Sequence, residues 1–591
     1  MQNALSTSSE PYNSIPKRLE AAVVDVLALS VPFGLGLTLL ACSGGDNVTS
    51  PNDTKVASVV VTPSNLSLLS FGDTATLSAT AMNAGGDAIS GASFTWASSD
   101  ENVVTVSSTG EVTAVADGTA TVSASTDGVS GSASVGVTQE GARLAFQVQP
   151  GNAEGQEPFG VTVAIEDANG HVVTGATDQV DVALAAYPAG SSLAGTTAVA
   201  ATGGLATFDD LSLALPGQGY TLEAASGTLT PDTTDPFDVR LTFAELAVQN
   251  GRHSCGLTSA GHAYCWGQNA FGVLGDGSTT NRPSPVPVLG GQNFVALSTG
   301  TYHTCALTGD GTAYCWGSNG YGDLGDGGTT ASAAPVAVSG GHTFKAIEAG
   351  FQFTCGIAST DITYCWGSNN DGELGNGTTT GSPVPTQVAG GLTFVQITAG
   401  VSYACGLTDT QKAYCWGYGG GVGQLGDDQG GSVSVPDSVW YDGVYASIRA
   451  GWSHTCAVTP DGEAMCWGDN RNGELGTNST TDAVVPEFVS TSLRFVAVVP
   501  GGYHTCGIAT TGSAYCWGLN DKGQLGTGTL VSDSVPAAVT GGLTFTDIGA
   551  GFDHTCALTD GSRAYCWGAN YYGQLGVGTN ADSAVPVEVK Q

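Results

Sequence analysis

The residues best suited to covalent chemistry are the cysteines, of which the chain has 15. Fourteen of them form seven pairs with nine residues between the two members, and Cys42 stands alone near the N-terminus. An even number of regularly spaced cysteines indicates disulfides if the chain is exported, which the N-terminal segment described below predicts. The spacing does not match that of the usual zinc sites. We therefore expect seven bridges: Cys255 with Cys265, Cys305 with Cys315, Cys355 with Cys365, Cys405 with Cys415, Cys456 with Cys466, Cys506 with Cys516, and Cys556 with Cys566.

A recurrent histidine lies two residues before the first cysteine of most pairs, and imidazole is a common metal ligand. However, Phe353 and Tyr403 take this position in two copies, which a symmetric metal site would not tolerate. We predict no metal site and expect buried histidines that are hydrogen-bonded within the scaffold. The histidines are His253, His303, His454, His504 and His554.

The two residues before the histidine position differ from copy to copy, and many of them are aromatic. Aromatic side chains gathered on a rigid face are the usual anchors of a protein or carbohydrate site. We predict a binding site there, with the alternative that these rings only cap the centre of the fold and contact no partner. The predicted binding residues are Arg252, Tyr302, Phe351, Trp452, Tyr503, Phe552 and Asp553.

All these positions belong to seven copies of one sequence pattern with a period of 50 residues and a single step of 51. Such a period is typical of a propeller or a solenoid. The last copy, from Phe545 to Gly576, contains the segments His-Thr-Cys-Ala-Leu, Ala-Tyr-Cys-Trp-Gly and Gly-Gln-Leu-Gly. The pattern resembles the regulator of chromosome condensation repeat, whose seven copies make a seven-bladed β-propeller. The resemblance covers residues 241–591 and implies that the recurrent Trp residues pack between blades.

A hairpin explains the cysteine spacing. Gly309-Asp310-Gly311 suits a three-residue loop that ends in a left-handed glycine. If Thr308 pairs with Thr312, Cys305 lies directly opposite Cys315, at about 4.5–5.5 Å between Cα atoms, which is within disulfide range.

The fourth copy departs from the pattern. Its segment Tyr418–Gly423 is rich in glycine and one residue longer than its counterparts. This segment either forms the lip of a site or belongs to a copy that has drifted from the others.

Two smaller units precede the repeats. Residues 56–139 contain short alternating strands, and their segments Thr95–Asp100 and Gly110–Ala114 resemble the bacterial Ig-like domain of group 2, which implies a β-sandwich with Trp96 in its core. Residues 143–240 follow the same style and predict a second Ig-like sandwich. Asp167, Asp209 and Asp210 could bind calcium between the units, but no loop has calcium-ligand spacing, and we expect solvated turn carboxylates.

The N-terminal 42 residues combine Lys17 and Arg18 with an apolar run that ends in Leu39-Leu40-Ala41-Cys42. This resembles a bacterial lipoprotein signal, which implies that Cys42 is acylated and becomes the mature N-terminus; the alternative is an ordinary signal peptide. Residues 43–55 then form a flexible linker. We expect a protein of the cell envelope, anchored to the outer membrane or cell surface by lipid alone, or otherwise secreted.

The composition of the chain excludes some classes of function and favours others. With 15 basic and 52 acidic residues the net charge is −37, which argues against nucleic-acid binding. The abundance of Gly, Val, Thr and Ser favours an all-β chain. We predict a non-enzymatic surface protein whose propeller head, on an Ig-like stalk, binds an extracellular protein or glycan without a cofactor. The alternatives are a secreted enzyme acting on polysaccharide, with Arg252 and Asp553 as its candidate pair, and a nucleotide exchange factor, which export and acidity disfavour.

Overall fold

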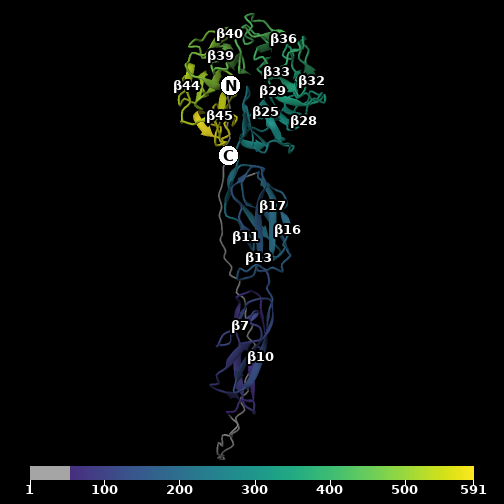
Figure 1. Cartoon of the computed structure of the whole chain (residues 1–591), viewed down its shortest axis with the longest axis vertical. Coiled ribbons are helices and arrows are strands. Elements are labelled where there is room, and N and C mark those ends of the chain that lie inside the picture. The colour runs from purple at the N-terminus through teal and green to yellow at the C-terminus, as the bar shows by residue number, and fades with distance from the viewer. Residues whose placement is uncertain (1–53, 189, 591) are drawn as a thin grey trace, which may run out of the picture.

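The computed structural model describes residues 54–188 and 190–590, so Cys42, the predicted signal and most of the predicted linker lie outside it. Two sandwiches follow one another as a stalk, and a propeller forms the head at the far end (Figure 1). The prediction of an all-β chain is confirmed, since the described residues contain one helical element, the 3-10 turn η1 (Ala270–Gly272). No helix in these two ranges is long and apolar enough to cross a membrane.

The first sandwich consists of three small sheets around a core of Val, Ala and Leu side chains. Its strands alternate buried and exposed residues because side chains of a strand point to opposite faces. Trp96 packs against this core, as predicted, but is only half-buried. The strands are β1 (Ser58–Thr62), β4 (Ser78–Met82) and β5 (Ala88–Ile89); β2 (Asn65–Leu68), β10 (Val129–Val137), β9 (Gly118–Thr126) and β6 (Thr95–Ser98); and β3 (Thr74–Thr76), β8 (Glu111–Ala114) and β7 (Val104–Val106).

The second sandwich packs a four-stranded sheet on a larger one, with aromatic and branched side chains such as Phe208 and Tyr220 between them. One sheet contains β11 (Arg143–Val148), β13 (Phe159–Glu166), β17 (Leu205–Leu213) and β15 (Leu193–Ala194). The other contains β12 (Ala153–Glu154), β20 (Phe237–Arg240), β18 (Gly217–Ala225), β14 (Gln179–Ala186), β16 (Ala198–Ala200) and β19 (Asp232–Thr233).

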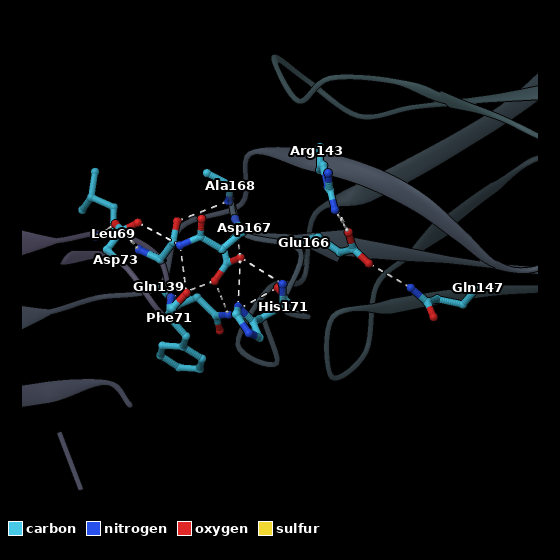
Figure 2. A network of polar contacts seen from close by, with 12 residues as sticks. Leu69, Phe71, Asp73, Gln139, Arg143, Gln147, Glu166, Asp167, Ala168 and His171 are labelled. Carbon is cyan, nitrogen blue, oxygen red and sulfur yellow. Dashed lines mark hydrogen bonds and ion pairs between the residues drawn. The ribbon is translucent and has the colours of Figure 1, made fainter. Parts of the chain in front are cut away.

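A buried carboxylate joins the two sandwiches (Figure 2). Asp167, which is fully buried, accepts hydrogen bonds from the Phe71 N–H at 2.9 Å and the Gln139 side chain at 3.0 Å, both across the joint. Burial alone would raise the pKa of Asp167, but bonds from Gln139, His171 and Phe71 outweigh it and hold the pKa below its ordinary value. The expectation of a solvated turn carboxylate is therefore wrong at Asp167, because the first sandwich covers it.

The head consists of seven four-stranded antiparallel sheets, each formed by consecutive strands with the first strand at the axis. From the first sheet to the last, the strands are β21 (Glu245–Ala247), β22 (His253–Leu257), β23 (Ala263–Gly267) and β24 (Arg282–Pro287); β25 (Phe294–Thr299), β26 (His303–Thr308), β27 (Ala313–Gly317) and β28 (Ser332–Ala337); β29 (Phe344–Ala349), β30 (Phe353–Ala358), β31 (Thr363–Gly367) and β32 (Ser382–Gln387); β33 (Phe394–Ala399), β34 (Tyr403–Thr408), β35 (Ala413–Gly417) and β36 (Val433–Ser438); β37 (Ser447–Ala450), β38 (His454–Val458), β39 (Ala464–Gly468) and β40 (Ala483–Phe488); β41 (Phe495–Pro500), β42 (His504–Ala509), β43 (Ala514–Gly518) and β44 (Asp533–Ala538); and β45 (Phe545–Ala550), β46 (His554–Thr559), β47 (Ala564–Gly568) and β48 (Ser583–Glu588).

The hairpin between the second and third strands carries a disulfide in every sheet. In the second sheet Cys305 pairs with Cys315 and the Thr308 N–H bonds to the Thr312 carbonyl, which is the predicted register. The Cα atoms of each pair are 4.0–4.1 Å apart, closer than the spacing we expected. Each bridge closes a short loop inside one sheet, so the bridges stabilise sheets rather than the ring.

All seven predicted disulfide pairs are present in the structure. The bridges join Cys255 to Cys265, Cys305 to Cys315, Cys355 to Cys365, Cys405 to Cys415, Cys456 to Cys466, Cys506 to Cys516, and Cys556 to Cys566. In every pair the two cysteines are direct partners across neighbouring strands, so the register argued for one copy holds for all seven.

Among the described residues, each sheet of the ring consists of consecutive strands, the first and last sheets included. The first and last sheets meet through a bridge between Gln249 and Ala550, and Trp266 donates to the Gln574 carbonyl at 3.0 Å. Ser254 and His554 also bond across this boundary, at 2.8 Å. The Trp–carbonyl and His–hydroxyl contacts recur between other neighbouring sheets, so in these contacts closure repeats the ordinary interface.

The head rests on the second sandwich at Gly155, which lies against Leu241 and Tyr264. A side chain at Gly155 would collide with Leu241 and the Tyr264 hydroxyl, each 2.5 Å from the added carbon, so only glycine permits this close approach. Thr242 donates to Glu154 at 3.2 Å across the same junction. Stalk and head are thus packed against each other at the first sheet.

Candidate functional site

The loops between the first and second strands of the sheets meet at the axis and bond to one another through their backbones. The Phe552 N–H donates to the Gly251 carbonyl at 2.8 Å, and the Trp452 N–H to the Gly501 carbonyl at 3.1 Å. Thr301 and Gly502 make the same bond to their neighbours, Gly350 and Gly551. The main chain therefore fixes these loops independently of their side chains.

The predicted aromatic residues form one continuous cluster on these loops, which we call the axial aromatic cluster. Ring centroids lie 5.3 Å apart for Tyr302 and Phe351, 5.9 Å for Phe351 and Trp452, and 4.7 Å for Trp452 and Phe552. Tyr503 joins through Phe552 at 5.5 Å. All five side chains are half-buried, so each keeps part of its surface exposed to solvent.

Arg252 and Asp553 lie together at the boundary between the first and last sheets. Their side chains are 3.5 Å apart, and the Arg252 guanidinium stands 4.4 Å from the centre of the Phe552 ring. Asp553 is 8% exposed and also accepts hydrogen bonds from Tyr571 and Gln574. Burial raises the pKa of Asp553 to about 6, and the Arg252 charge limits the rise.

Two aromatic residues of this face were not predicted. Phe271 is 52% exposed and packs 5.9 Å from Tyr302, and Tyr571 bonds to Asp553. Both occupy the variable pair of the Asn-x-x-Gly segment in their copies. These two positions vary from copy to copy, as the axial loops do. The same signal could therefore have identified Phe271 and Tyr571.

Six of the seven copies have a polar side chain at the variable position of the Gly-x-Leu-Gly segment. Glu474, Gln524 and Gln574 each accept a hydrogen bond there from the backbone N–H two residues earlier, at 2.6–2.9 Å. Asp323 is one methylene shorter than Glu and fully buried, and neither of its carboxylate oxygens has a hydrogen-bond partner of normal geometry among the described residues. Burial raises the pKa of Asp323 to about 7, which Ser318 and Tyr321 offset only in part.

The recurrent histidines connect neighbouring sheets and do not gather at one point. His303 Nε2 lies 2.8 Å from the Thr354 hydroxyl of the next sheet, and that hydroxyl donates to the Asp323 carbonyl. Nε2 therefore carries the proton and donates it. Burial lowers the pKa of His303 to about 3, so the ring stays neutral. Within residues 54–188 and 190–590, no three His, Cys, Asp or Glu residues lie close enough together to hold a metal ion.

A channel of about 390 Å³ follows the axis between the first strands of the sheets. Its lining includes Glu245, Glu348, Asp547 and Arg449. Burial raises the pKa of all three acids, and the Arg449 charge limits the rise for Glu348 and Asp547. Asn250 crosses the axis and donates to the Ala399 carbonyl at 3.1 Å, so the first and fourth sheets touch at the axial loops.

The glycine-rich segment of the fourth sheet lies beside the cluster. Tyr418 and Trp452 both line a pocket of about 260 Å³ on this face. The segment therefore contributes to the wall of a pocket on the face of the axial aromatic cluster.

Comparison with known proteins identifies two kinds of domain. Residues 263–591 match the family described as the RCC1-like domain, and residues 249–273 match the regulator of chromosome condensation (RCC1) repeat. Residues 55–137 match the bacterial Ig-like domain (group 2). No curated protein matches the chain.

Solved structures share the fold of the head at low sequence identity. Prp20p from Saccharomyces cerevisiae is 20% identical with a TM-score of 0.51, and the match covers 59% of this chain and 88% of that one. Human WBSCR16 is also 20% identical, with a TM-score of 0.50 and coverage of 55% and 89%. At this identity the likeness concerns architecture alone.

Proposed function

The chain belongs to the RCC1-like domain family through its C-terminal half, and from this premise we propose that it is a non-enzymatic binding protein of the cell envelope. The propeller head captures an extracellular macromolecule, and the two sandwiches hold the head away from the membrane. Cys42 anchors the chain by a lipid at the outer membrane or cell surface.

The axial aromatic cluster carries this proposal. Five aromatic side chains fall within one variable pair of positions in an otherwise repeated pattern, and they meet on a single face. Neighbouring rings and the backbone bonds of the loops order them before any partner arrives, so binding loses little conformational entropy. Half-buried aromatic residues at the centre of a surface are the type of anchor that contributes about 2 kcal/mol or more to a complex.

Export is supported by the seven disulfides, which form in oxidising compartments. The acidic surface fits a partner with basic groups, because complementary charge speeds association. This partner is a protein in our proposal, and a glycan is the other possibility.

A capture experiment tests the proposal. The full chain without its signal segment is used as bait for proteins from the culture supernatant and the envelope fraction of the source cells. The variant Trp452→Ala/Tyr503→Ala is the comparison, and Trp440→Ala, which removes a 64% exposed ring outside the cluster, is the control. A partner that binds wild type and Trp440→Ala but not the double variant supports the proposal.

One observation favours a second function, an enzyme acting on polysaccharide. The pKa of Asp553, at about 6, suits a general acid, and Arg252 and Tyr571 lie beside it. Glycoside hydrolysis needs a second carboxylate in the same site. Asp582, whose charge adds to the rise of the Asp553 pKa, already accepts the Asn570 N–H at 2.7 Å. Release of reducing ends from polysaccharides that Asp553→Asn abolishes would favour this enzyme.

A further inference from the structure

The pocket beside Trp452 has the chemistry of a specific subsite. Its volume is about 260 Å³, and it lies where the third, fourth and fifth sheets meet on the face of the axial aromatic cluster. Trp452 and Tyr418 supply aromatic walls, and Tyr418 is 43% exposed. Asp371, Ser402 and Gln424 supply polar groups to the same lining.

Gln424 is the unusual member of this lining. It is 2% exposed, and its side-chain oxygen Oε1 has no hydrogen-bond partner among the described residues. At the same position of the third and sixth sheets, the side-chain oxygens of Glu373 and Gln524 accept the backbone N–H two residues earlier, each at 2.9 Å. A buried acceptor without a donor is unfavourable by about 1–3 kcal/mol, so an incoming donor at Gln424 is favoured.

The glycine-rich segment accounts for this free acceptor. The other six copies have Asn-x-x-Gly before this position, whereas the fourth has Gly419 in place of the Asn and one additional residue. Gly420 and Gly421, which lie in the departing segment, both have positive φ, so the segment follows a path that other residues would rarely adopt. The N–H of Val422, two residues before Gln424, makes no bond to its side chain in the structure.

The pocket presents acceptors and aromatic rings and no cation. None of its lining residues is Lys, Arg or His, while Asp371 contributes a carboxylate. The pocket can therefore bind hydrogen-bond donors. A positively charged donor is attracted both by the Asp371 carboxylate and by the aromatic rings. The guanidinium is a flat group with five N–H donors that stacks on aromatic faces, and Arg252 makes such a contact with Phe552 on the same face.

We propose that this pocket receives an arginine side chain of the protein partner, with its guanidinium between Trp452 and Tyr418 and its N–H groups donating to Asp371 and Gln424 Oε1. The inference rests on the proposed function and specifies the chemistry of the partner. It also gives a role to the glycine-rich segment by which the fourth copy departs from the others.

Saturation-transfer NMR titrations of the full chain without its signal segment test the proposal with N-acetyl-L-arginine amide. Its citrulline analogue, which has the same shape without the charge, and methyl α-glucoside are the comparison probes. We expect the arginine probe to bind at least about tenfold more tightly than either. Equal binding of the citrulline analogue, tighter binding of the glucoside, or no binding of the arginine probe would overturn the proposal.

Two substitutions assign the binding to this pocket. Asp371→Asn should weaken the arginine probe about fivefold to tenfold, since it removes the charge while its backbone bond to Glu373 remains. Gln424→Glu should tighten it by a similar factor, and Glu at this position in the third and fifth sheets indicates that the fold accepts it. Gln524→Glu, where the side-chain oxygen already has a donor, is the matched control and should have no effect.

The same variants separate this inference from the proposed function. If Asp371→Asn and Gln424→Glu leave capture of the partner unchanged while Trp452→Ala/Tyr503→Ala abolishes it, the face binds its partner and the arginine pocket is refuted. If Asp371→Asn weakens capture and Gln424→Glu strengthens it, both are supported.

Discussion

Asp323 departs from the residues at this position in the other copies, and its ionisation tests how such a departure affects the stability of the head. Its carboxyl has a pKa of about 7 in the folded head against an ordinary value of 3.8, because burial disfavours the charged form. As the pH rises from about 4 to 7, the unfolded chain releases this proton while the folded head retains it. The contribution of Asp323 to the free energy of unfolding is therefore greatest at low pH. It decreases as the pH rises from about 4 and is lost once the pH passes about 7.

The magnitude follows from the shift. Each unit is equivalent to about 1.4 kcal/mol, so the loss between pH 5 and pH 8 amounts to about 3 kcal/mol. Asp323→Asn keeps the shape and removes the titration. We predict that this variant gains about 3 kcal/mol relative to wild type between pH 5 and pH 8. The pH dependence of the histidines is common to both proteins and cancels in the difference.

Urea unfolding of the full chain at the two pH values, followed by tryptophan fluorescence, provides the measurement. The seven recurrent Trp residues are fully buried between sheets of the head and report its unfolding. Asp560→Asn, at an exposed hairpin turn, is the control and should give the same difference at both pH values. A difference for Asp323→Asn that does not change with pH would refute the reasoning.

Three further predictions concern the His303–Thr354 contact between sheets, the joint between the sandwiches and the lipid anchor at Cys42. Thr354→Val should destabilise the head by about 1–3 kcal/mol in urea unfolding, since it leaves His303 Nε2 buried without a partner; an unchanged midpoint would contradict this role. Asp167→Ala should loosen the joint between the sandwiches, visible as a broader distance distribution in small-angle X-ray scattering, whereas an unchanged profile would mean that other contacts hold it. Cys42→Ala should release the protein from the membrane fraction on immunoblots, and full retention would exclude the lipid anchor.

The sequence predicted the scaffold well because the scaffold repeats. The pairing of Cys305 with Cys315 followed from one hairpin loop, and the buried Trp residues followed from their recurrence. The positions of the aromatic residues along the repeat also predicted that they would meet at one face. Long-range contacts that occur once were beyond such reasoning. Asp167 is buried only because another domain covers it, which no local pattern signals.

The exceptions to the repeat were visible in the sequence, but their consequences were not. The glycine-rich segment was recognised as a departure, whereas the free acceptor at Gln424 depends on a backbone path set by several positive φ angles. Asp323 differs from its counterparts by one methylene, and only the geometry of Glu474 and Gln524 shows that this length decides whether a hydrogen bond forms.

The central claim is that the axial aromatic cluster binds the partner, and the dissociation constant of the captured partner tests it most directly. Trp452→Ala/Tyr503→Ala should raise the Kd at least about tenfold, equivalent to about 1.4 kcal/mol, with a melting temperature close to that of wild type because backbone bonds hold the loops. The control Trp440→Ala should leave the Kd unchanged. A double variant that is folded and binds with the wild-type Kd would contradict the account, and one that unfolds would show that these rings serve the fold instead of a partner.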